Sequence, residues 1–328
     1  MKKKIKIAVL GAAEIAFRRF MPALIQNENF EYVGVAYYRE QDAQKVIAFQ
    51  ENYGGSIIKG FDSVFNDSGI DAVYVPQPPA LHYKFGLDVL KFGKHLFMEK
   101  PFTTSLKDTE ELISIAKTKG LAVNENYMFR FHKQICDFVK LCKEGIVGKI
   151  NHYEVRFCFP LRSQNDFRYL KALGGGALLD CGGYTIMLSN ILVGGDGIIH
   201  PNSPIYEKGF EVDMHGSGIM ESKSTHLTCS FYYGMDDQYS CYAKAFGDKG
   251  ILLAPRVLTA PSDLDVFFDV LDLKRKLIKQ ILIGKDDSFF KSIDNFKESI
   301  INPSMRMENY DKILQQANYI EEMKRKQK

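Results

Sequence analysis

The sequence lacks several features that would assign it to a particular class of protein. Its formal net charge is only +3, which gives no reason to expect nucleic acid or an anionic membrane as a partner. It has no low-complexity segment and no clear internal repeat. No apolar run approaches the roughly 18 residues that a membrane-spanning helix requires. What remains is the composition of a globular protein, 45% hydrophobic and 25% charged, with the length of two domains or one large one.

Closely spaced cysteines are also lacking. The six cysteines are scattered and none forms a CxxC pair, so we expect reduced thiols rather than a zinc site or a disulfide framework. Residues 1–20 have the basic start and the apolar run of a signal peptide. However, Lys6 and Glu14 interrupt the run, and no small-residue cleavage site follows it. We therefore expect a cytoplasmic protein.

Two hydrophobic periods alternate in the first part of the chain. Apolar, strand-like runs cover 5–11, 32–38, 72–77, 95–99 and 121–127. Amphipathic helical patterns cover 17–26, 41–52, 81–93 and 105–120. Strands and helices that alternate over short connections indicate a parallel, doubly wound sheet, and nearly continuous apolar strands fit a sheet covered on both faces. This pattern predicts an α/β domain over residues 1–123.

The periodicity changes in the second part of the chain. Polar and apolar residues alternate in the segments 149–159, 224–234 and 239–250. Such alternation indicates an antiparallel sheet with one buried face. We therefore expect a second, α+β domain with a large open antiparallel sheet over residues 124–328. Its last segment, 307–326, has a helical pattern, and this helix packs either within the second domain or back on the first.

A loop of small residues follows the first strand-like run. The sequence VLGAAEIA places Gly11, Ala13 and Ala16 at the spacing of a degraded G-x-G-x-x-G fingerprint. Small residues there let the backbone turn tightly and approach a pyrophosphate at the N-terminus of the next helix. The residues expected at these cofactor phosphates are Gly11, Ala13, Glu14 and Ile15. The alternative is that the small residues serve only the packing of the strand against the helix.

No acidic residue ends the second strand-like run, where NAD-binding folds place the carboxylate that binds the ribose 2′-hydroxyl. The chain has Tyr37, Tyr38 and Arg39 there. Without the acid nothing repels a 2′-phosphate, and the Arg39 guanidinium can pair with it. The segment therefore favours NADP(H) over NAD(H). In the alternative, Arg39 only solvates a helix start and the tyrosines line an adenine pocket.

The sequence LFMEKPFTT puts a lysine and a proline directly after an apolar strand. Ligands of open α/β sheets bind beyond the carboxyl ends of the strands, and Lys100 lies at such an end. An ammonium group there can hydrogen-bond a substrate oxygen and stabilise the negative charge that develops during hydride transfer. The alternative is a lysine that only caps the rim of the sheet.

A glycine-rich segment of the second domain, GGGALLDCGGY, leads into a helical pattern. Asp180 and Tyr184 are four positions apart, so a helix places both side chains on one face. A tyrosine near a lysine can act as a general acid, because the positive charge lowers the pKa of the phenol from about 10. Asp180 could orient this tyrosine or accept protons. The alternative is a packing helix with a polar edge.

Together these motifs resemble one known family. This is the Gfo/Idh/MocA family, named after glucose–fructose oxidoreductase and inositol dehydrogenase. The chain resembles it in the order and spacing of five motifs: the glycine loop, EKP at 99–101, NENYMFRFH at 124–132, GGGALLDCGGY at 174–184 and AFGDKGIL at 245–252. The resemblance covers essentially the whole chain. It implies an N-terminal Rossmann domain and a C-terminal substrate-binding and oligomerisation domain. It also implies a homodimer or a dimer of dimers formed through the large sheet.

The resemblance implies roles for single residues as well. Lys100 takes the position of the catalytic lysine, and Asp180 that of the aspartate in a D-x-x-x-H pattern. Tyr184 stands where many members have histidine, as in the branch with dihydrodiol and xylose dehydrogenases and sugar ketoreductases. A phenol there suits proton donation during ketone reduction. Further positions near the cofactor fall on Pro76, Gln77, His82, Glu99 and Arg168.

The function implied is hydride transfer between NADP(H), or NAD(H), and a hydroxyl or ketone group of a sugar, polyol or diol. Two alternatives are a dinucleotide-binding sensor without catalysis and a redox-neutral enzyme that uses tightly held NAD(H) to modify glycosides. A metal site at Asp213 and His215 is not expected, because a single pair offers too few ligands. The basic segment 273–284 is expected as a solvated edge or dimer rim rather than a membrane anchor.

Overall fold

The chain forms two compact units in the computed structural model, which describes residues 3–163 and 165–325. Unit 1 consists of Met1–Tyr127 and Phe289–Ala317. Unit 2 consists of Met128–Ser288 and Asn318–Lys328. Each unit has its own sheet, and each is described separately below.

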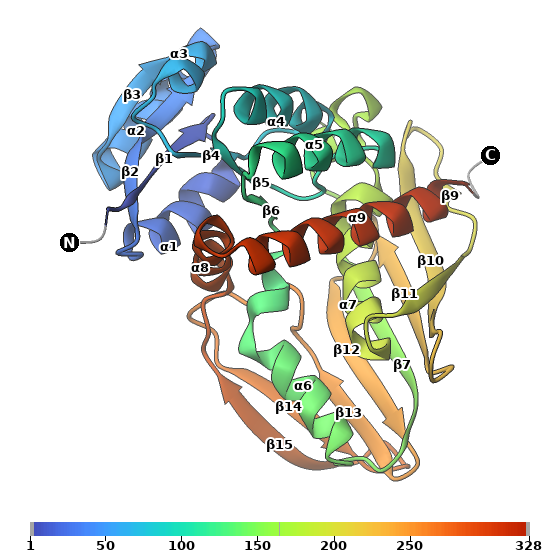
Figure 1. The fold of residues 1–328 in the computed structure, drawn as a ribbon. Coiled ribbons are helices and arrows are strands. Elements are labelled where there is room, and N and C mark those ends of the chain that lie inside the picture. The colour runs from blue at the N-terminus through green and yellow to red at the C-terminus, as the bar shows by residue number, and fades with distance from the viewer. Residues whose placement is uncertain (1–2, 164, 326–328) are drawn as a thin grey trace. The chain divides into compact units, whose positions relative to one another are not determined.

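Two C-terminal helices contribute to unit 1, namely α8 (Ser288–Ile301) and the first part of α9 (Pro303–Arg325) (Figure 1). Tyr310 and Ile313 of α9 are buried in the core of this unit. The Tyr310 hydroxyl also donates a hydrogen bond to the carbonyl oxygen of Leu121. Unit 1 therefore contains segments from both halves of the chain, and its limits differ from the division expected after residue 123.

The sheet of unit 1 is parallel throughout the described residues. Its strands are β1 (Ile5–Leu10), β2 (Phe30–Tyr37), β3 (Ser56–Lys59), β4 (Ala72–Val75), β5 (His95–Met98) and β6 (Val123–Glu125). Their spatial order is β3-β2-β1-β4-β5-β6, which confirms the expected doubly wound domain. Because the order reverses between β1 and β4, the carboxyl ends of these two strands form the switch point where such sheets bind ligands. Strand β3 was not expected, since it is short and only partly buried.

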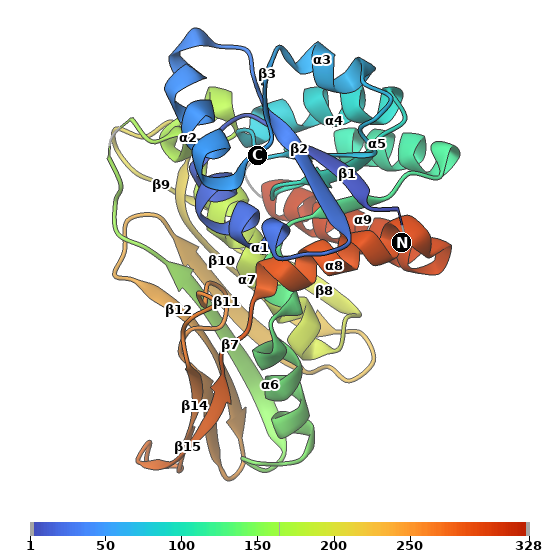
Figure 2. The same ribbon diagram turned by 90° about the vertical axis from the view of Figure 1, so that its left-hand side faces the viewer.

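Helices cover both faces of this sheet (Figure 2). They are α1 (Met21–Ile25), α2 (Ala43–Tyr53), α3 (Phe61–Asn66), α4 (His82–Lys91) and α5 (Leu106–Lys119). On one face, buried side chains of α3, α4, α5 and α9 share a core with Val73 and Leu96. On the other face the Phe20 ring stacks on Tyr74 with a centroid distance of 3.7 Å. Since both faces are covered, both sets of alternating strand residues are apolar, which explains the continuous apolar runs.

The larger sheet belongs to unit 2. Its strands are β7 (Ile150–Cys158), β8 (Gly197–Pro201), β9 (Ile205–Tyr206), β10 (Asp213–Ser222), β11 (Thr228–Gly234), β12 (Ser240–Gly247), β13 (Gly250–Ala254), β14 (Val266–Leu271) and β15 (Leu277–Gly284). Their order is β15-β14-β13-β12-β7-β11-β10-β8, with β9 paired to β10. Among the described strands every neighbouring pair is antiparallel except β7 and β11. The expected antiparallel sheet is therefore confirmed, with one parallel pair at its centre.

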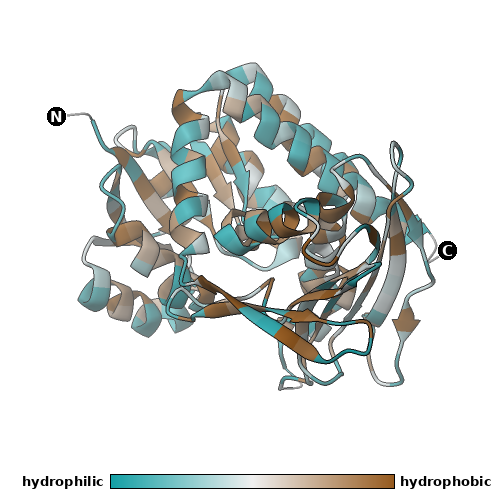
Figure 3. Ribbon diagram, turned by 90° about the horizontal axis from the view of Figure 1, so that it is seen from below, coloured by the Kyte–Doolittle hydropathy of each residue, from teal (hydrophilic) through white to brown (hydrophobic). Residues whose placement is uncertain are grey.

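Helix α7 (Gly183–Val193) packs against β7, β10 and β11 of this sheet (Figure 1). Along β7 the side chains of Tyr153, Val155 and Phe157 are buried, whereas Glu154 and Arg156 are partly exposed. Apolar and polar segments also alternate along the ribbon in Figure 3. Alternation with a period of two places one set of residues under the helix and the other on the opposite face.

Strand β15 is an edge of the larger sheet and contains most of the basic segment 273–284. Leu277, Ile278 and Leu282 are exposed on it. The segment thus occupies the solvated sheet edge that the sequence predicted, with apolar side chains among its lysines.

One described segment, Lys171–Val193, is long and apolar enough to cross a membrane, with a hydropathy of 1.3 over its most apolar window. In the structure 89% of that window is buried inside the protein. The expectation that no apolar run approaches the length of a membrane span was therefore wrong for this segment. A helix that is apolar on all sides is typical of a protein core as well as of a membrane, and burial against the sheet accounts for this one.

Candidate active site

The loop after β1 has a backbone shape that suits a dinucleotide phosphate. Gly11 has a φ of 99°, a conformation that glycine adopts easily and other residues rarely. A Cβ atom at Gly11 would lie 2.3 Å from Nε2 of Gln77, so a larger residue would collide with that side chain. Without a Cβ atom, the loop packs directly against Gln77 and turns tightly at the switch point, where such sheets bind ligands. The residues present therefore fit the pyrophosphate of a nicotinamide dinucleotide.

Glu14 and Ile15 follow this loop and are exposed. Glu14 accepts a hydrogen bond from Arg18 at 2.8 Å, four residues further along the chain. A π-helical turn, Ala16–Phe20, then leads into α1. The start of this helical segment presents backbone N–H groups, which favour anions.

Two cations lie at the adjacent ends of β2 and β3. Nε of Arg39 donates to Oδ2 of Asp42 at 2.7 Å, and this hydrogen bond raises the pKa of the guanidinium. Lys59, whose partner across the sheet is Tyr37, donates to Glu40 at 2.6 Å. Both ion pairs are exposed and hence weak, so a phosphate can exchange with the carboxylates. The sequence analysis missed Lys59 because it missed β3, and a short apolar pair before a lysine was the only signal.

Tyr38 forms an exposed aromatic surface beside these cations. Its ring meets the Phe61 ring edge-on with a centroid distance of 5.0 Å. The Arg39 guanidinium lies 5.7 Å from the centre of the Tyr38 ring. An aromatic ring next to a cation can bind the face of an adenine and the phosphate on its ribose.

Glu99 lies inside unit 1, although the sequence predicted it at the cofactor. Its side chain is only 9% exposed, and Oε1 accepts hydrogen bonds from the Tyr74 hydroxyl at 2.8 Å and from Asn126 Nδ2 at 2.7 Å. Burial raises the pKa of this carboxyl, and the two hydrogen bonds oppose the rise. Oε2 of Glu99 also accepts a hydrogen bond from the Lys100 N–H at 3.4 Å, so this carboxyl supports the backbone next to Lys100. Its contact with the cofactor stays a prediction.

His82 was also expected beside the cofactor, and the structure buries it completely. Its Nδ1 lies 2.7 Å from the carbonyl oxygen of Pro101, and its Nε2 lies 2.6 Å from that of Gln77. Burial lowers the pKa of the ring to about 4. The ring therefore connects the loop after β4, which begins at Pro76, with the segment that carries Lys100.

Asp180 of unit 2 pairs with Arg168. Nε of Arg168 donates to Oδ2 of Asp180 at 2.8 Å, and a second nitrogen of the guanidinium lies 3.1 Å from Asp166. Burial lowers the pKa of Arg168, but the two carboxylates outweigh this effect and raise it. The sequence predicted Arg168 near the cofactor, whereas the structure shows its guanidinium engaged by two acids of its own unit.

Tyr184 lies in the first turn of α7 and is only 7% exposed. Its ring packs against Phe129 and Phe157, with centroid distances of 5.6 Å and 5.3 Å. Its hydroxyl is 3.9 Å from the sulfur of Met128. The phenol is thus held by apolar neighbours that fix its direction and limit its access to water.

A buried carboxylate that the sequence analysis did not assign to the site holds the start of this helical segment. Oδ2 of Asp213 accepts a hydrogen bond from the Leu178 N–H at 2.7 Å. A Cβ atom at Gly176 would lie 2.3 Å from Oδ1 of the same carboxylate, and one at Gly175 would lie 2.3 Å from the carbonyl oxygen of Arg168. Gly175 and Gly176 of GGGALLD are therefore required by close contacts. Since Asp213 is 35 residues from Leu178, no local pattern could reveal this contact.

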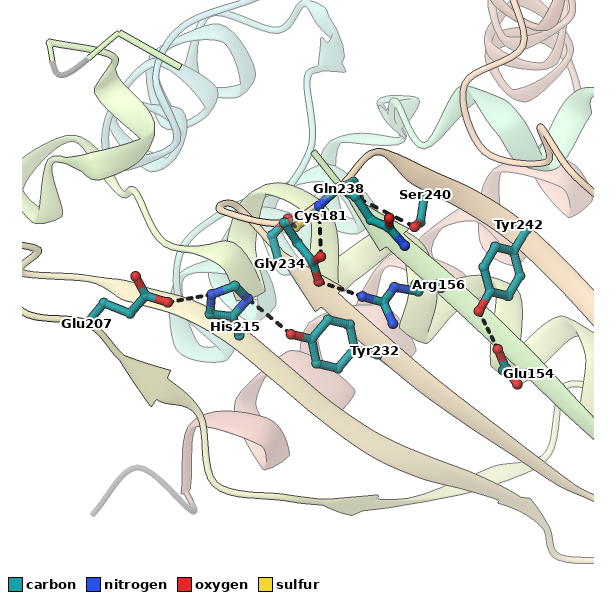
Figure 4. Close-up of polar contacts among 11 residues, drawn as sticks. Glu154, Arg156, Cys181, Glu207, His215, Tyr232, Gly234, Gln238, Ser240 and Tyr242 are labelled. Carbon is teal, nitrogen blue, oxygen red and sulfur yellow. Dashed lines mark hydrogen bonds and ion pairs between the residues drawn. The ribbon is translucent and has the colours of Figure 1, made fainter. Parts of the chain in front are cut away.

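A chain of polar side chains lies on the sheet of unit 2 (Figure 4). Nε2 of His215 is 2.7 Å from Oε1 of Glu207, and Nδ1 is 3.1 Å from the Tyr232 hydroxyl. Nearby, Arg156 pairs with Asp237. Among residues 3–163 and 165–325 no group of three or more His, Cys, Asp or Glu side chains could hold a metal ion.

The site residues predicted from the sequence thus fall into two sets. Unit 1 brings the Gly11 loop, Gln77, His82 and the Lys100–Pro101 segment into one connected structure. Unit 2 brings Arg168 and Asp180 together and seats Tyr184 in the helix that follows.

Comparisons with known proteins cover nearly the whole chain. Residues 5–127 match the oxidoreductase family with an NAD-binding Rossmann fold, and residues 138–253 match the GFO/IDH/MocA C-terminal domain. A dTDP-3,4-didehydro-2,6-dideoxy-alpha-D-glucose 3-reductase from Actinomadura kijaniata is 31% identical over 318 residues, which are 97% of this chain and 94% of that protein. The reductase of the same name from Saccharopolyspora spinosa is 30% identical over 333 residues, covering 98% and 97%.

The structure is also similar to solved structures. A 3-ketoreductase from Actinomadura kijaniata in complex with NADP and TDP-benzene has a TM-score of 0.90 and 30% identity, with 98% of both chains covered. Solved variants of that reductase have a tyrosine replaced by phenylalanine, or a lysine replaced by alanine or glutamate. The replaced lysine and tyrosine are as far apart along that chain as Lys100 and Tyr184 are along this one.

Proposed function

Because this chain belongs to the Gfo/Idh/MocA oxidoreductase family, we propose that it is an NADPH-dependent ketoreductase that acts on a nucleotide-linked keto sugar. Reduction of a sugar carbonyl is the activity named for the relatives above, which span nearly all of the chain. None of these relatives is named as a sensor or as a glycoside-modifying enzyme, so the relatives support neither alternative.

The observation that carries the proposal is the setting of Tyr184. The position holds a phenol packed between Phe129 and Phe157, where many members of the family have an imidazole. A neutral phenol holds its proton at neutral pH and releases it to a stronger base such as a developing alkoxide. This property suits the reduction of a ketone better than the abstraction of a proton from an alcohol.

The chemical roles follow from the residue types. The cofactor, when bound, supplies the hydride that adds to the carbonyl carbon. The Lys100 ammonium stabilises the negative charge on the carbonyl oxygen, and the Tyr184 hydroxyl donates the proton that this oxygen gains. The equal spacing of the lysine and the tyrosine replaced in the related reductase supports this pair.

The cofactor is held by unit 1 in this proposal. Gly11, Ala13, Glu14 and Ile15 surround the pyrophosphate, and Pro76 with Gln77 borders the nicotinamide. Tyr37 and Tyr38 border the adenosine, and Arg39 binds the 2′-phosphate together with Lys59. The two cations at adjacent strand ends favour NADP(H) over NAD(H). The related reductase was crystallised with NADP.

Three buried or partly buried residues support the reacting groups. Glu99 and His82 fix the backbone around Lys100 from inside unit 1. Arg168 fixes Asp180 at the start of the segment that carries Tyr184. These residues therefore act through their neighbours rather than on the substrate.

Two further properties belong to the proposal. The exposed apolar residues of β15 support a homodimer, or a dimer of dimers, formed through the large sheet. The cysteines of the described residues are all free thiols, which supports a cytoplasmic location.

The decisive experiment is an assay with a dTDP-linked 3-keto sugar prepared enzymatically just before use. We expect the purified protein to oxidise NADPH in step with the appearance of the 3-hydroxy sugar nucleotide, measured by absorbance and mass spectrometry. The Lys100→Met variant is the matched control for contaminating reductases. Oxidation of NADPH with free keto sugars but not with the nucleotide-linked one would contradict the proposed substrate. Oxidation of polyols with NADP⁺, without reduction of any ketone, would contradict the proposed direction.

A further inference from the structure

We infer that His82 is a positioning residue that holds the Lys100–Pro101 segment in a fixed place relative to the cofactor loop. This inference rests on the proposed function of Lys100. It assigns a task to a buried ring that the reaction itself does not use. Both ring nitrogens lie within hydrogen-bond distance of backbone carbonyl oxygens, at 2.7 Å for Pro101 and 2.6 Å for Gln77.

The first connection runs from the glycine loop to the loop after β4. Nε2 of Gln77 donates to the carbonyl oxygen of Leu10, and the same nitrogen occupies the space that a Cβ atom of Gly11 would need. The side chain of Gln77 therefore holds this residue at the end of β1. Its own carbonyl oxygen is the acceptor that faces His82, so the ring is tied to the cofactor loop.

The second connection runs from the ring to the catalytic lysine. Pro101 directly follows Lys100, and its carbonyl oxygen faces Nδ1 of His82. The next residue, Phe102, donates its N–H to Oε1 of Glu125 at 2.7 Å. The backbone after Lys100 is thus held at two successive residues, and the contact with His82 leads back to the cofactor loop.

Histidine is well suited to this task. Its two nitrogens point in opposite directions from a rigid ring, so one side chain can reach carbonyl groups on two different segments. Because burial lowers the pKa of the ring to about 4, the ring is neutral at neutral pH and donates one hydrogen bond, to one of the two carbonyl oxygens, while its other nitrogen packs against the second carbonyl. The ring is completely buried, so water cannot replace a lost contact at either carbonyl. Asparagine is shorter and reaches at most one of the two.

His95 offers a matched control in the same unit. It begins β5, whereas Lys100 follows the other end of that strand. Its Nδ1 accepts a hydrogen bond from the Ala122 N–H at 2.9 Å, so it too connects two segments. Burial lowers the pKa of both histidines to about 4. A purely structural role for His82 would make the two rings equivalent in their effect on turnover.

The test compares His82→Asn with His95→Asn in steady-state and single-turnover assays of the wild-type reaction. We expect His82→Asn to lower kcat about a hundredfold, because a small displacement of a catalytic group has an effect of this order. The isotope effect with 4-deuterated NADPH should rise, and the Kd of NADPH should change less than threefold. In a Lys100→Met background, His82→Asn should cause no further loss. Equal kcat values for the two histidine variants, or a full additional loss in that background, would overturn the inference.

A second readout covers the case in which His82→Asn does not fold. Nitrogen-15 labelling of histidine in the wild-type chain should reveal a ring N–H that exchanges slowly with water. Its signal should shift both on addition of NADP⁺ and in the Lys100→Met variant, and it should persist in His95→Asn. The absence of such a signal would overturn the inference. Failure of the wild-type protein to turn over would instead count against the proposed function, and the labelling result would still decide the role of the ring.

Discussion

Nε of Arg168 donates to Oδ2 of Asp180 across 2.8 Å, and both side chains are largely buried. The sequence suggested separate tasks for these residues, one at the cofactor and one beside the tyrosine. In the structure Arg168 and Asp180 form one charged cluster with Asp166, just before the helix that carries Tyr184. The guanidinium thereby fixes the segment from which the proton donor projects.

Replacing Arg168 by methionine should destabilise the protein by about 3 kcal/mol, because it leaves the Asp180 carboxylate without this partner in a largely buried place. The free energy of unfolding in urea measures the effect. Arg18→Gln is the control, since the pair of Arg18 with Glu14 has the same 2.8 Å distance but is exposed. That change should cost about 0.5 kcal/mol. Similar losses in the two variants would refute a supporting role for Arg168.

Replacing Tyr184 by phenylalanine should lower kcat at least about a hundredfold, because the proton donor is lost. The packing against Phe129 and Phe157 remains, so the melting temperature should hardly change. Tyr319→Phe is the matched control, because it removes a buried hydroxyl that donates to the Gly197 carbonyl at 2.8 Å in the same unit. This control should lose stability and keep its kcat. Unchanged turnover in Tyr184→Phe would rule out the phenol as the acid.

Replacing Arg39 by alanine should weaken the binding of NADPH about tenfold, which corresponds to one charge-assisted contact with the 2′-phosphate. The binding of NADH should hardly change. Fluorescence titrations with both cofactors measure the two constants. Lys6→Ala is the control for net charge, since Lys6 is exposed on the same sheet at the start of β1. Equal losses of affinity for NADPH and NADH in Arg39→Ala would show that Arg39 does not contact the 2′-phosphate.

Asp213 should make the stability depend on pH in a direction opposite to most carboxylates. Burial raises its pKa from 3.8 to about 6 in the folded protein. Between these values the folded chain binds more protons than the unfolded chain, so the free energy of unfolding falls as the pH rises from about 4 to about 6. The contribution of this residue is about 3 kcal/mol, since one pKa unit corresponds to about 1.4 kcal/mol.

Asp213→Asn removes this titration and keeps an oxygen that can accept from the Leu178 N–H. The difference in unfolding free energy between wild type and variant, measured in urea at several pH values, should therefore change across this window. Hydrogen bonding with Leu178 and the charges of Lys324 and His215 oppose the rise in the pKa of Asp213, so these groups should be kept intact. A constant difference between the two proteins would exclude Asp213 as the titrating group.

Much of the fold follows from local sequence patterns. The strands β1, β4 and β5 are nearly continuous apolar runs, which indicates that both faces of their sheet are buried. The strands β7 and β12 alternate with a period of two, which indicates one buried face. Strand β3 gave no such signal, because it has two polar ends and lies at the edge of its sheet. Its omission concealed Lys59 as well.

The candidate site was less predictable than the fold. The motifs place Lys100 after a strand end and Tyr184 after a glycine-rich segment, and the roles of both residues stay predictions. The positions of the Glu99 and His82 side chains were not predicted, because a motif shows that a residue matters and does not show which way its side chain points. Asp213 acts across a long stretch of chain, and such a contact leaves no trace in local periodicity.

The contact between Gln77 and Gly11 has a consequence for engineering. The amide of Gln77 packs against Gly11 of the glycine loop. The shape of this loop therefore depends on two segments that are distant in the sequence. A loop transplanted from a relative to change cofactor preference keeps room for this amide only where it retains glycine at the position of Gly11, since a Cβ atom there would lie 2.3 Å from Gln77. A loop with a larger residue at that position should therefore succeed only if Gln77 is replaced by a smaller residue as well.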